Sequence, residues 1–475
     1  MMGGHMKKHI GRILILSVLI MGCIWQTITL WLGDMSGHNF FAKDTASYET
    51  SYLYPKEIWS NINGSIYRIE GNNDEDAMRY KLLYELFGEL KKENVTVELS
   101  PKISYDELLS STPGIIYEYG TSLTIDEMMG QSMKALNSKS NSMKLNDLYI
   151  DMSDRESYKA YVYFIDKSYN VSQKVTINNL LDYHSEAIEY YKNVEQVGGI
   201  KTYQASLLSP NDSEIFAGNI FYPLNNQAMP IYYKKLVLEH HIQEIDSEKL
   251  ENHVNDLFKN PAYKTKILVQ NGVTFSDNLN VSVTYNYVGT LEFKKSPAND
   301  TEKSSSVERI SKINTFIKES KAIPDFLKKG LYLNEIKTDE ETGETRYLFG
   351  YQYDNVDVVL SEQAKEELGV SAFLELAIKN SEIIRGKWVM LEPVSRSYPN
   401  PNANLNLNVN AFQKESTDAI SDILEQVEIE EDSTFELEDL ECAYIIGDIR
   451  EAMQFGWVGY YKENPILVNE KIDNE

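Results

Sequence analysis

Residues 249–295 read KLENHVNDLFKNPAYKTKILVQNGVTFSDNLNVSVTYNYVGTLEFKK. The beginning of this stretch has apolar residues at helical spacing, Ser247 can cap that helix, and Pro261 lies just beyond its end. Further along, apolar and polar residues alternate, which is typical of half-buried strands. Asn271-Gly272 lies between two strand-like runs and suits a type I′ hairpin turn. The stretch therefore predicts an antiparallel meander packed on a helix.

The same order, a helix followed by a meander, occurs again in the next part of the chain. A predicted helix carries Val307, Ile310, Ile313 and Ile317 on one face and is broken at Pro324. The strand-like runs after it are 331–337, 347–353, 356–360, 372–378 and 382–391. We expect an α+β domain at 151–295, a polar linker, and a second α+β domain at 306–395.

The flanking regions extend this organisation in both directions. The middle domain begins with a predicted buried strand at 159–166 and an amphipathic helix at 176–193. Before it, a helix at 74–92 lies among strand-like runs at 63–70, 94–99 and 114–119, which predicts an α/β domain at 34–150. After the run Pro399-Asn400-Pro401-Asn402, residues 396–475 form a C-terminal extension with a helix at 411–427. We expect this extension to pack on the preceding domain.

The composition excludes several classes of protein. The chain has 475 residues, 42% of them hydrophobic, so it can bury several cores. Its net charge of −26 disfavours binding to nucleic acids and to anionic lipid head groups. Two cysteines are too few for a disulfide framework. We expect a multi-domain protein whose partners are not polyanions.

Residues 13–32 form an uninterrupted apolar run, ILILSVLIMGCIWQTITLWL. A helix of that length spans about 30 Å, enough to cross a bilayer. Lys7, Lys8 and Arg12 precede the run and Asp34 follows it, so the positive-inside rule places residues 1–12 in the cytoplasm. The predicted protein is a single-pass membrane protein whose bulk is extracytoplasmic.

One stripe of the predicted anchor carries small and polar side chains. Gly22, Gln26, Thr29 and Gly33 recur at spacings of four, three and four residues. Such stripes allow transmembrane helices to approach closely and to hydrogen bond across the interface, so we predict a partner helix there. The alternative is that Gln26 reaches water or backbone carbonyls and that the stripe has no partner.

A second interpretation of this segment is a lipoprotein signal. Residues 20–23, IMGC, end in a cysteine that lipoproteins modify, yet the apolar run continues well past Cys23. This continuation favours an uncleaved anchor over a lipidated Cys23 or a released signal peptide.

The sequence gives no support for catalysis, a cofactor or a metal. It lacks the phosphate-binding glycine loops and the H-E-x-x-H and G-x-S-x-G motifs. His240, His241 and His253 cluster but lack the further ligands of a zinc site. Asp354 and Asp357 do not by spacing alone indicate a glycosidase pair. The acids between 428 and 441 are predicted to form a solvated face, with loose cation binding as the alternative.

Several stretches resemble the YycH family of Gram-positive bacteria. They are the basic tail and single anchor, EIWSNINGSIYRIEGN at 57–72, PGIIYEYGTSLTIDEMM at 113–129, the stretch at 249–295 quoted above, and residues 310–394. The resemblance implies a membrane-anchored accessory regulator without catalytic residues. It also implies a complex with a YycI-like protein and the WalK sensor histidine kinase, whose signalling it adjusts to the state of the cell wall.

The overall expectation is therefore an α+β protein, in which one transmembrane helix precedes an ectodomain of helices packed on antiparallel β-meanders. Its expected function is non-catalytic regulation of a cell-wall-sensing kinase. The main alternative is a membrane-tethered binding module or lipoprotein that recognises a peptide or wall fragment in a deep aromatic pocket. A cell-wall enzyme is the third alternative, and it would need several acids or histidines that converge in a cleft.

Overall fold

Contacts within the computed structural model divide the chain into residues 1–49 and 50–475, and the elements described here belong to the second unit. The structure describes residues 53–62, 64–69, 80, 83, 86–88, 97–129, 144–153, 159–167, 171–178, 202–209, 215–224, 231–242, 247–277, 280–297, 304–395, 409–427, 435–461 and 464–469. Within this part of the chain, no helix is long and apolar enough to cross a membrane. The predicted anchor at 13–32 lies outside the described residues.

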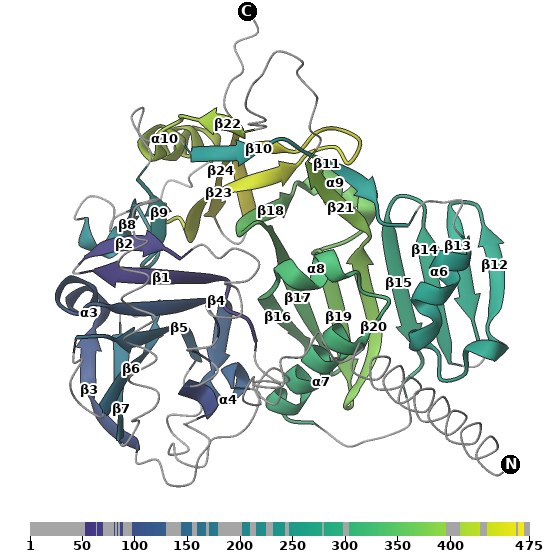
Figure 1. The fold of residues 1–475 in the computed structure, drawn as a ribbon, viewed down its shortest axis with the longest axis horizontal. Helices are drawn as coiled ribbons and strands as arrows, with labels where there is room; N and C mark the ends of the chain where they lie inside the picture. Colours follow the sequence, from purple (N-terminus) through teal and green to yellow (C-terminus); the bar gives the residue numbers. More distant parts are fainter. Residues whose placement is uncertain are drawn as a thin grey trace, which may run out of the picture. The chain divides into compact units, whose positions relative to one another are not determined.

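The first sheet is antiparallel throughout and contains nine strands in the described residues, in the order β3-β7-β6-β5-β4-β1-β2-β8-β9 (Figure 1). Its strands are β1 (Glu57–Ile62), β2 (Ser65–Arg68), β3 (Val97–Ser104), β4 (Gly114–Thr124), β5 (Lys144–Asp151), β6 (Lys159–Asp166), β7 (Val171–Asn178), β8 (Thr202–Ala205) and β9 (Phe221–Pro223). The helices α3 (Tyr105–Ser111) and α4 (Ile125–Met128) follow β3 and β4 directly.

The second large sheet contains twelve strands in the described residues, in the order β12-β13-β14-β15-β20-β19-β17-β18-β23-β24-β25, with β16 paired to β17. Its strands are β12 (Thr265–Val269), β13 (Gly272–Ser276), β14 (Val281–Asn286), β15 (Thr290–Lys295), β16 (Leu331–Asp339), β17 (Glu344–Tyr353), β18 (Val356–Leu360), β19 (Leu374–Lys379), β20 (Glu382–Val389), β23 (Asp439–Ile446), β24 (Gln454–Tyr461) and β25 (Asn464–Asn469). Strands β18 and β23 are parallel, whereas the other pairs are antiparallel.

Two short ribbons complete the sheet structure. One pairs β10 (Ile231–Lys234) with β22 (Val409–Phe412), and the other pairs β11 (Leu236–His240) with β21 (Leu391–Ser395). In each ribbon, a strand that follows the first sheet in the chain pairs with a strand from a much later part of the chain.

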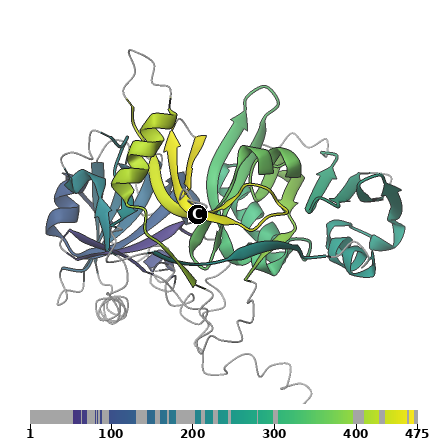
Figure 2. The ribbon, with the colours of Figure 1, turned by 90° about the horizontal axis from the view of Figure 1, so that it is seen from above.

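Five further helices lie in the part of the chain that contains the second sheet. They are α6 (Ser247–Val254), α7 (Ser306–Glu319), α8 (Asp325–Gly330), α9 (Glu362–Leu368) and α10 (Ser416–Gln426). Figure 1 shows α6 across the sheet portion formed by β13 and β14, and α10 packs on β24 and β25 (Figure 2). Ser305 caps α7 in a capping box with Glu308, which satisfies the first amide groups of that helix.

Sheet-rich architecture with antiparallel meanders is therefore present, as the sequence predicts. Strands β5 and β6 pair directly, so the predicted boundary between residues 150 and 151 falls inside the first sheet. Strands β15 and β20 likewise join the two predicted helix-and-meander regions into one sheet. The division into domains stays a prediction, because a shared sheet does not establish which segments fold independently.

Three local predictions differ from the structure. Residues 176–178 belong to β7, not to a helix, because Val175 and Ile177 follow the two-residue period of a buried strand. The remainder of the helix predicted at 176–193 lies outside the described residues. Residues 411–412 end a strand, and the helix that follows begins at Ser416.

The third difference concerns the hairpin between β12 and β13. Its two turn residues are Gln270 and Asn271, and neither has the positive φ angle that a type I′ turn requires. Gly272 is the first residue of β13, where a Cβ atom would lie 2.1 Å from the carbonyl oxygen of Tyr285. The glycine therefore serves the close approach of β14, not the turn.

Candidate functional site

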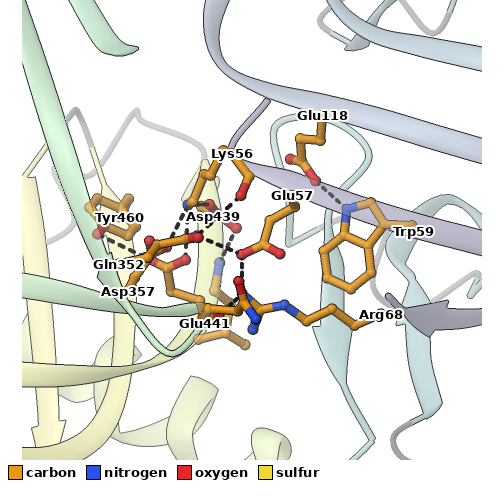
Figure 3. Close-up of polar contacts among 12 residues, drawn as sticks. Lys56, Glu57, Trp59, Arg68, Glu118, Gln352, Asp357, Asp439, Glu441 and Tyr460 are labelled. Atoms are coloured by element: carbon orange, nitrogen blue, oxygen red, sulfur yellow. Dashed lines mark hydrogen bonds and ion pairs between the residues drawn. The ribbon is translucent and has the colours of Figure 1, made fainter. Parts of the chain in front are cut away.

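Lys56, just before β1, inserts its ammonium group among carboxylates of the second sheet. Its Nζ atom lies 3.0 Å from Asp357 Oδ2 on β18, 3.3 Å from Asp439 Oδ2 and 2.9 Å from Glu441 Oε2, both on β23 (Figure 3). The Lys56 side chain is 10% exposed. A buried ammonium group needs such partners because it loses its hydration. Lys56 therefore connects the first sheet to two strands of the second.

The neighbouring residue, Glu57, makes a second connection between the same two sheets. Arg68 of β2 forms an ion pair with Glu57, and Gln352 of β17 donates a hydrogen bond of 2.9 Å to Glu57 Oε1. Gln352 also donates to the carbonyl oxygen of Lys56, at 3.2 Å. The hydroxyl group of Tyr460 donates a hydrogen bond of 3.0 Å to Glu441 Oε1. The residues that make these contacts are called the inter-sheet cluster: Lys56, Glu57, Arg68, Gln352, Asp357, Asp439, Glu441 and Tyr460.

A row of three carboxyl groups continues from this cluster into the first sheet. Glu57 on β1 is paired in register with Glu118 on β4, which is paired with Asp147 on β5. Directly opposed like charges destabilise a sheet unless cations or protons neutralise them. We call these three residues the carboxylate row.

One cation and two hydrogen-bond donors contact Glu118 and Asp147 in this row. Lys167, just after β6, forms an ion pair with Glu118 and lies 3.6 Å from Asp147 Oδ1. Trp59 Nε1 donates to Glu118 Oε2 at 2.6 Å, and the Tyr105 hydroxyl donates to Asp147 Oδ2 at 2.8 Å. The central member of the row therefore has the strongest support for its negative charge.

The protonation states follow from these environments. Burial raises the pKa of Glu57 and that of Asp147 to about 7 in each case, and Arg68 and Lys167 respectively offset this effect only in part. Burial also opposes ionisation of Glu118, but Lys167 and the hydrogen bond from Trp59 lower the pKa of that carboxyl below its ordinary value. The two outer members of the row, Glu57 and Asp147, therefore bind a proton readily, whereas the central member, Glu118, stays ionised.

The acids around Lys56 divide in the same way. Burial and the charge of Asp357 hold the pKa of Glu441 well above its ordinary value, which favours the protonated form of Glu441. Burial acts against ionisation of Asp357 as well, but Lys56 overcomes it and the pKa of Asp357 is lowered to about 2. Six carboxyl groups and three cations are thus accommodated because protons neutralise part of the acid.

The space beside these groups is small. A cavity of about 40 Å³ is bordered by the charged members of the inter-sheet cluster and by the aromatic side chains of Trp59, Tyr203, Phe221 and Phe455. That volume accommodates a few water molecules, whereas pockets for small-molecule ligands measure about 300–1,000 Å³. Acids do converge here, as an enzyme would require, but they contact lysine and arginine and, among the residues that the structure describes, face no cleft of substrate size. The arrangement can bind protons and hold two sheets in register.

The structure places the other sequence candidates as follows. Gly22, Gln26, Thr29 and Gly33 lie outside the described residues. His241 lies 3.3 Å from a carboxylate oxygen of Glu392, and its ring centre lies 5.8 Å from that of His253. Among the described residues, no group of three His, Cys, Asp or Glu side chains is arranged to hold a metal ion.

The acids that the sequence analysis singled out lie in different surroundings from one another. Asp354 lies at an exposed turn, where it forms an ion pair of 2.6 Å with Lys234, whereas Asp357 is buried against Lys56. Asp439 and Glu441 belong to the acidic run that was predicted to be a solvated face. For these two residues that prediction is wrong, because both contact the buried ammonium group of Lys56.

Sequence reasoning missed the inter-sheet cluster, although a signal was present. Asp357, Glu441 and Glu118 are single charges within otherwise apolar strands, in VDVVL, LECAYII and GIIYEYG. An ionised group in a buried strand requires a partner, so such positions indicate buried ion pairs. Nothing in the sequence shows that the partner of Asp357 and Glu441 is Lys56.

Comparisons with known proteins identify a solved structure with a similar fold. No family model and no curated protein matches the sequence. The structure of YycH from Bacillus subtilis is similar to this chain, with a TM-score of 0.56 and 13% sequence identity over 89% of this chain and 97% of that one. An uncharacterized protein from Eubacterium rectale has a TM-score of 0.34 and 14% identity over 59% and 92%. The first comparison shows that this chain has a YycH-like fold.

Proposed function

We propose that this protein is a non-catalytic, extracytoplasmic regulator that binds a WalK-like sensor histidine kinase together with a YycI-like protein. In this proposal residues 13–32 remain in the cell membrane as a single-pass anchor, with residues 1–12 in the cytoplasm. The ectodomain biases the signalling state of the kinase in response to the cell wall of a Gram-positive bacterium.

The observation that carries the proposal is the similarity of fold to YycH, which extends over 97% of the YycH chain. The YycH-like sequence stretches add support, because they include strands of both large sheets of that fold. EIWSNINGSIYRIEGN begins with β1 and includes β2, and residues 310–394 include strands β16–β20. A likeness that spans both sheets favours a shared architecture over a chance match of one meander.

The inter-sheet cluster is consistent with an ectodomain in which a change in the position of one sheet also moves the other. Glu57 and Lys56 form ion pairs or hydrogen bonds with β17, β18 and β23, and so join segments from distant parts of the chain. Buried ion pairs add little net stability, but in several systems they specify one arrangement over others. A partner that contacts one sheet can therefore displace the other with it, and a coupling free energy of about 1–3 kcal/mol is enough for regulation.

Contact with the kinase is proposed to involve the anchor. The stripe of Gly22, Gln26, Thr29 and Gly33 offers close approach and an amide hydrogen bond to a transmembrane helix of the partner. The lipoprotein alternative would remove this contact, because cleavage before Cys23 leaves no spanning helix.

Co-purification tests the proposal. The full chain is expressed with the WalK-like kinase and the YycI-like protein of the same organism, membranes are solubilised in detergent, and the chain is isolated by an affinity tag. We expect both partners to be retained. The double substitution Gly22→Leu with Gln26→Leu should release the kinase, whereas Ile20→Leu with Ile24→Leu, on the opposite side of the helix, should not.

The possible outcomes separate the parts of the proposal. Release by the stripe substitutions alone supports contact through the anchor. If the stripe variant retains the kinase as well as the control does, the stripe has no role. If the unsubstituted chain retains neither partner, the proposed complex does not exist.

A further inference from the structure

Strand β12 ends the second sheet on one side. In the described part of the chain it pairs with β13 and has no strand on its other side. All five residues of Thr265–Val269 are exposed. Edge strands present backbone N–H and C=O groups that another chain can extend by one strand.

The edge also exposes large apolar side chains. Tyr263 is 74% exposed and Leu268 is 73% exposed, and Ile267 and Val269 are exposed as well. Leu268 lies opposite Val273 in the sheet, and Val273 is buried. The apolar face that α6 covers over β13 and β14 therefore continues uncovered onto β12. Ile267 and Val269 lie on the other face of the strand from Leu268, so both faces of this edge expose apolar side chains, as an edge that accepts a partner strand would.

The charge of this edge is opposite to that of the whole protein. Residues 259–270, KNPAYKTKILVQ, include three lysines and no acid, although the chain as a whole has 72 acidic against 46 basic residues. Lys264 forms an ion pair of 2.9 Å with Glu251, and the side chains of Lys259 and Lys266 are exposed to solvent. The edge is thus a locally basic strip on an acidic protein, and its charge complements an acidic partner.

From this edge we infer an interaction site: β12 accepts an extended segment of a partner protein, in which acidic and apolar residues alternate, as an additional β-strand. Residues on one face of that segment would contact Ile267 and Val269, and acids on its other face would lie near Lys266. Backbone hydrogen bonds would supply much of the affinity, and the alternating side chains would supply the specificity.

A second copy of this chain fits the edge less well. In a two-fold pairing centred on Ile267, the Lys266 residues of the two copies would lie diagonally across the new pair of strands on the same face. Lysines on an edge are a common means of preventing such self-pairing. The same lysines attract an acidic segment, so charge decides between the two occupants.

Binding of synthetic peptides to the full chain tests this inference. The probe is a short fluorescent peptide of alternating Glu and Val, and its anisotropy reports binding. We expect saturable binding, and no binding of the same peptide when every backbone nitrogen is methylated, which blocks both edges of the strand. The methylated peptide keeps the charge and the apolar groups but cannot form a strand pair, so this control requires no change to the protein.

Two substitutions examine the edge itself. Lys266→Glu should weaken binding of the Glu–Val peptide about fivefold and strengthen binding of a Lys–Val peptide, whereas Lys329→Glu, at an exposed lysine of α8, should do neither. The two residues that flank the turn, Val269 and Gly272, form a hydrogen-bonded pair, so the N–H of Leu268 points outward. Leu268→Pro should therefore abolish binding while β13 keeps its own pairing.

The results can overturn the inference in several ways. Equal binding of the methylated and unmethylated peptides would indicate charge attraction without strand addition. Undiminished binding to the Leu268→Pro variant would place the site elsewhere. A concentration-dependent dimer that Leu268→Pro abolishes would show that the edge serves a second copy of this chain instead of an acidic segment.

Discussion

The Nζ atom of Lys56 lies 2.9 Å from Oε2 of Glu441, a residue 385 positions further along the chain. Lys56 leads into β1 of the first sheet and Glu441 lies on β23 of the second. The contact therefore joins residues from near the two ends of the described chain. Because both polar groups are buried, substitutions at this contact and around it should have measurable effects on stability.

Lys56→Met should destabilise the protein by about 3–5 kcal/mol, because it leaves buried carboxylates without their cation. The free energy of unfolding in denaturant measures the effect. Lys365→Met is the matched control, since it removes an ion pair with Glu362 that is largely exposed, and it should cost about 1 kcal/mol or less. Similar effects of the two substitutions would show that Lys56 has no special structural role.

Asp357→Asn and Glu441→Gln should have unequal effects on the same free energy. Glu441 already carries a proton, so glutamine reproduces its charge, and Glu441→Gln should cost about 1 kcal/mol or less. Asp357 is ionised beside Lys56, so Asp357→Asn should cost about 2–4 kcal/mol. The reverse order would mean that the proton resides on Asp357.

The contribution of Glu57 should make stability fall as pH rises. Its pKa is about 7 in the folded protein, against the ordinary value of 4.5 expected in the unfolded chain, so between these values the folded state binds more protons than the unfolded state. The stabilisation is complete below pH 4.5 and is lost as pH rises through 7. Relative to Glu57→Gln, the wild type should lose about 1–3 kcal/mol between about pH 5 and pH 8.

His253 acts in the opposite direction, which is why the Glu57 effect is measured as a difference. Burial, and then the charge of His241, lower the pKa of His253 to about 4, so its contribution to stability rises as pH increases from 4 to 6.5. Both wild type and Glu57→Gln contain His253, and its effect cancels between them. A difference that stays constant or grows with pH would contradict the assignment of a proton to Glu57.

Gly120→Ala should weaken the contact between the two sheets. A Cβ atom at Gly120 of β4 would lie 2.8 Å from the carbonyl oxygen of Leu333 on β16, so the backbones must move apart. We expect a cost of about 1–3 kcal/mol in thermal or chemical unfolding. Gly447→Ala is the control, because no atom lies within 4 Å of its Cβ position and its φ is not positive. A neutral Gly120→Ala would show that the sheets do not pack closely at this point.

Local pattern predicted much of the secondary structure. The run KAYVYFID is β6 at 159–166, and VDVVL is β18 at 356–360, with the bounds that the sequence predicts. At the described positions of the helix predicted at 74–92, Leu83 and Phe87 are buried, as expected for its apolar face. These predictions succeed because each depends on residues that are neighbours in sequence.

Helix α9 shows a signal that was overlooked. Ser361 caps it, and Gly369 ends it with a left-handed conformation at φ 60°. Both are recognised helix-boundary residues, but the helix has only seven residues and lies between strand-like runs. A short amphipathic segment gives too weak a periodicity to stand out from a meander.

The pairing of Lys56 with Asp357 and Glu441 could not have been predicted in the same way. Each residue shows locally only that it is charged, and which charges meet depends on how the two sheets pack. The order of the first sheet, in which β7 lies between β3 and β6, depends likewise on contacts between distant segments. Such relationships are properties of the folded chain and not of any local stretch.

Kinase activity in reconstituted membranes tests the central claim most directly. The full chain, the WalK-like kinase and the YycI-like protein are placed in the same vesicles, and the initial rate of kinase autophosphorylation is compared with that of vesicles lacking this chain. We predict a change of about fivefold or more, corresponding to about 1 kcal/mol of coupling. An unchanged rate, with all three proteins verified in the same vesicles and in the same orientation, would contradict the proposed role.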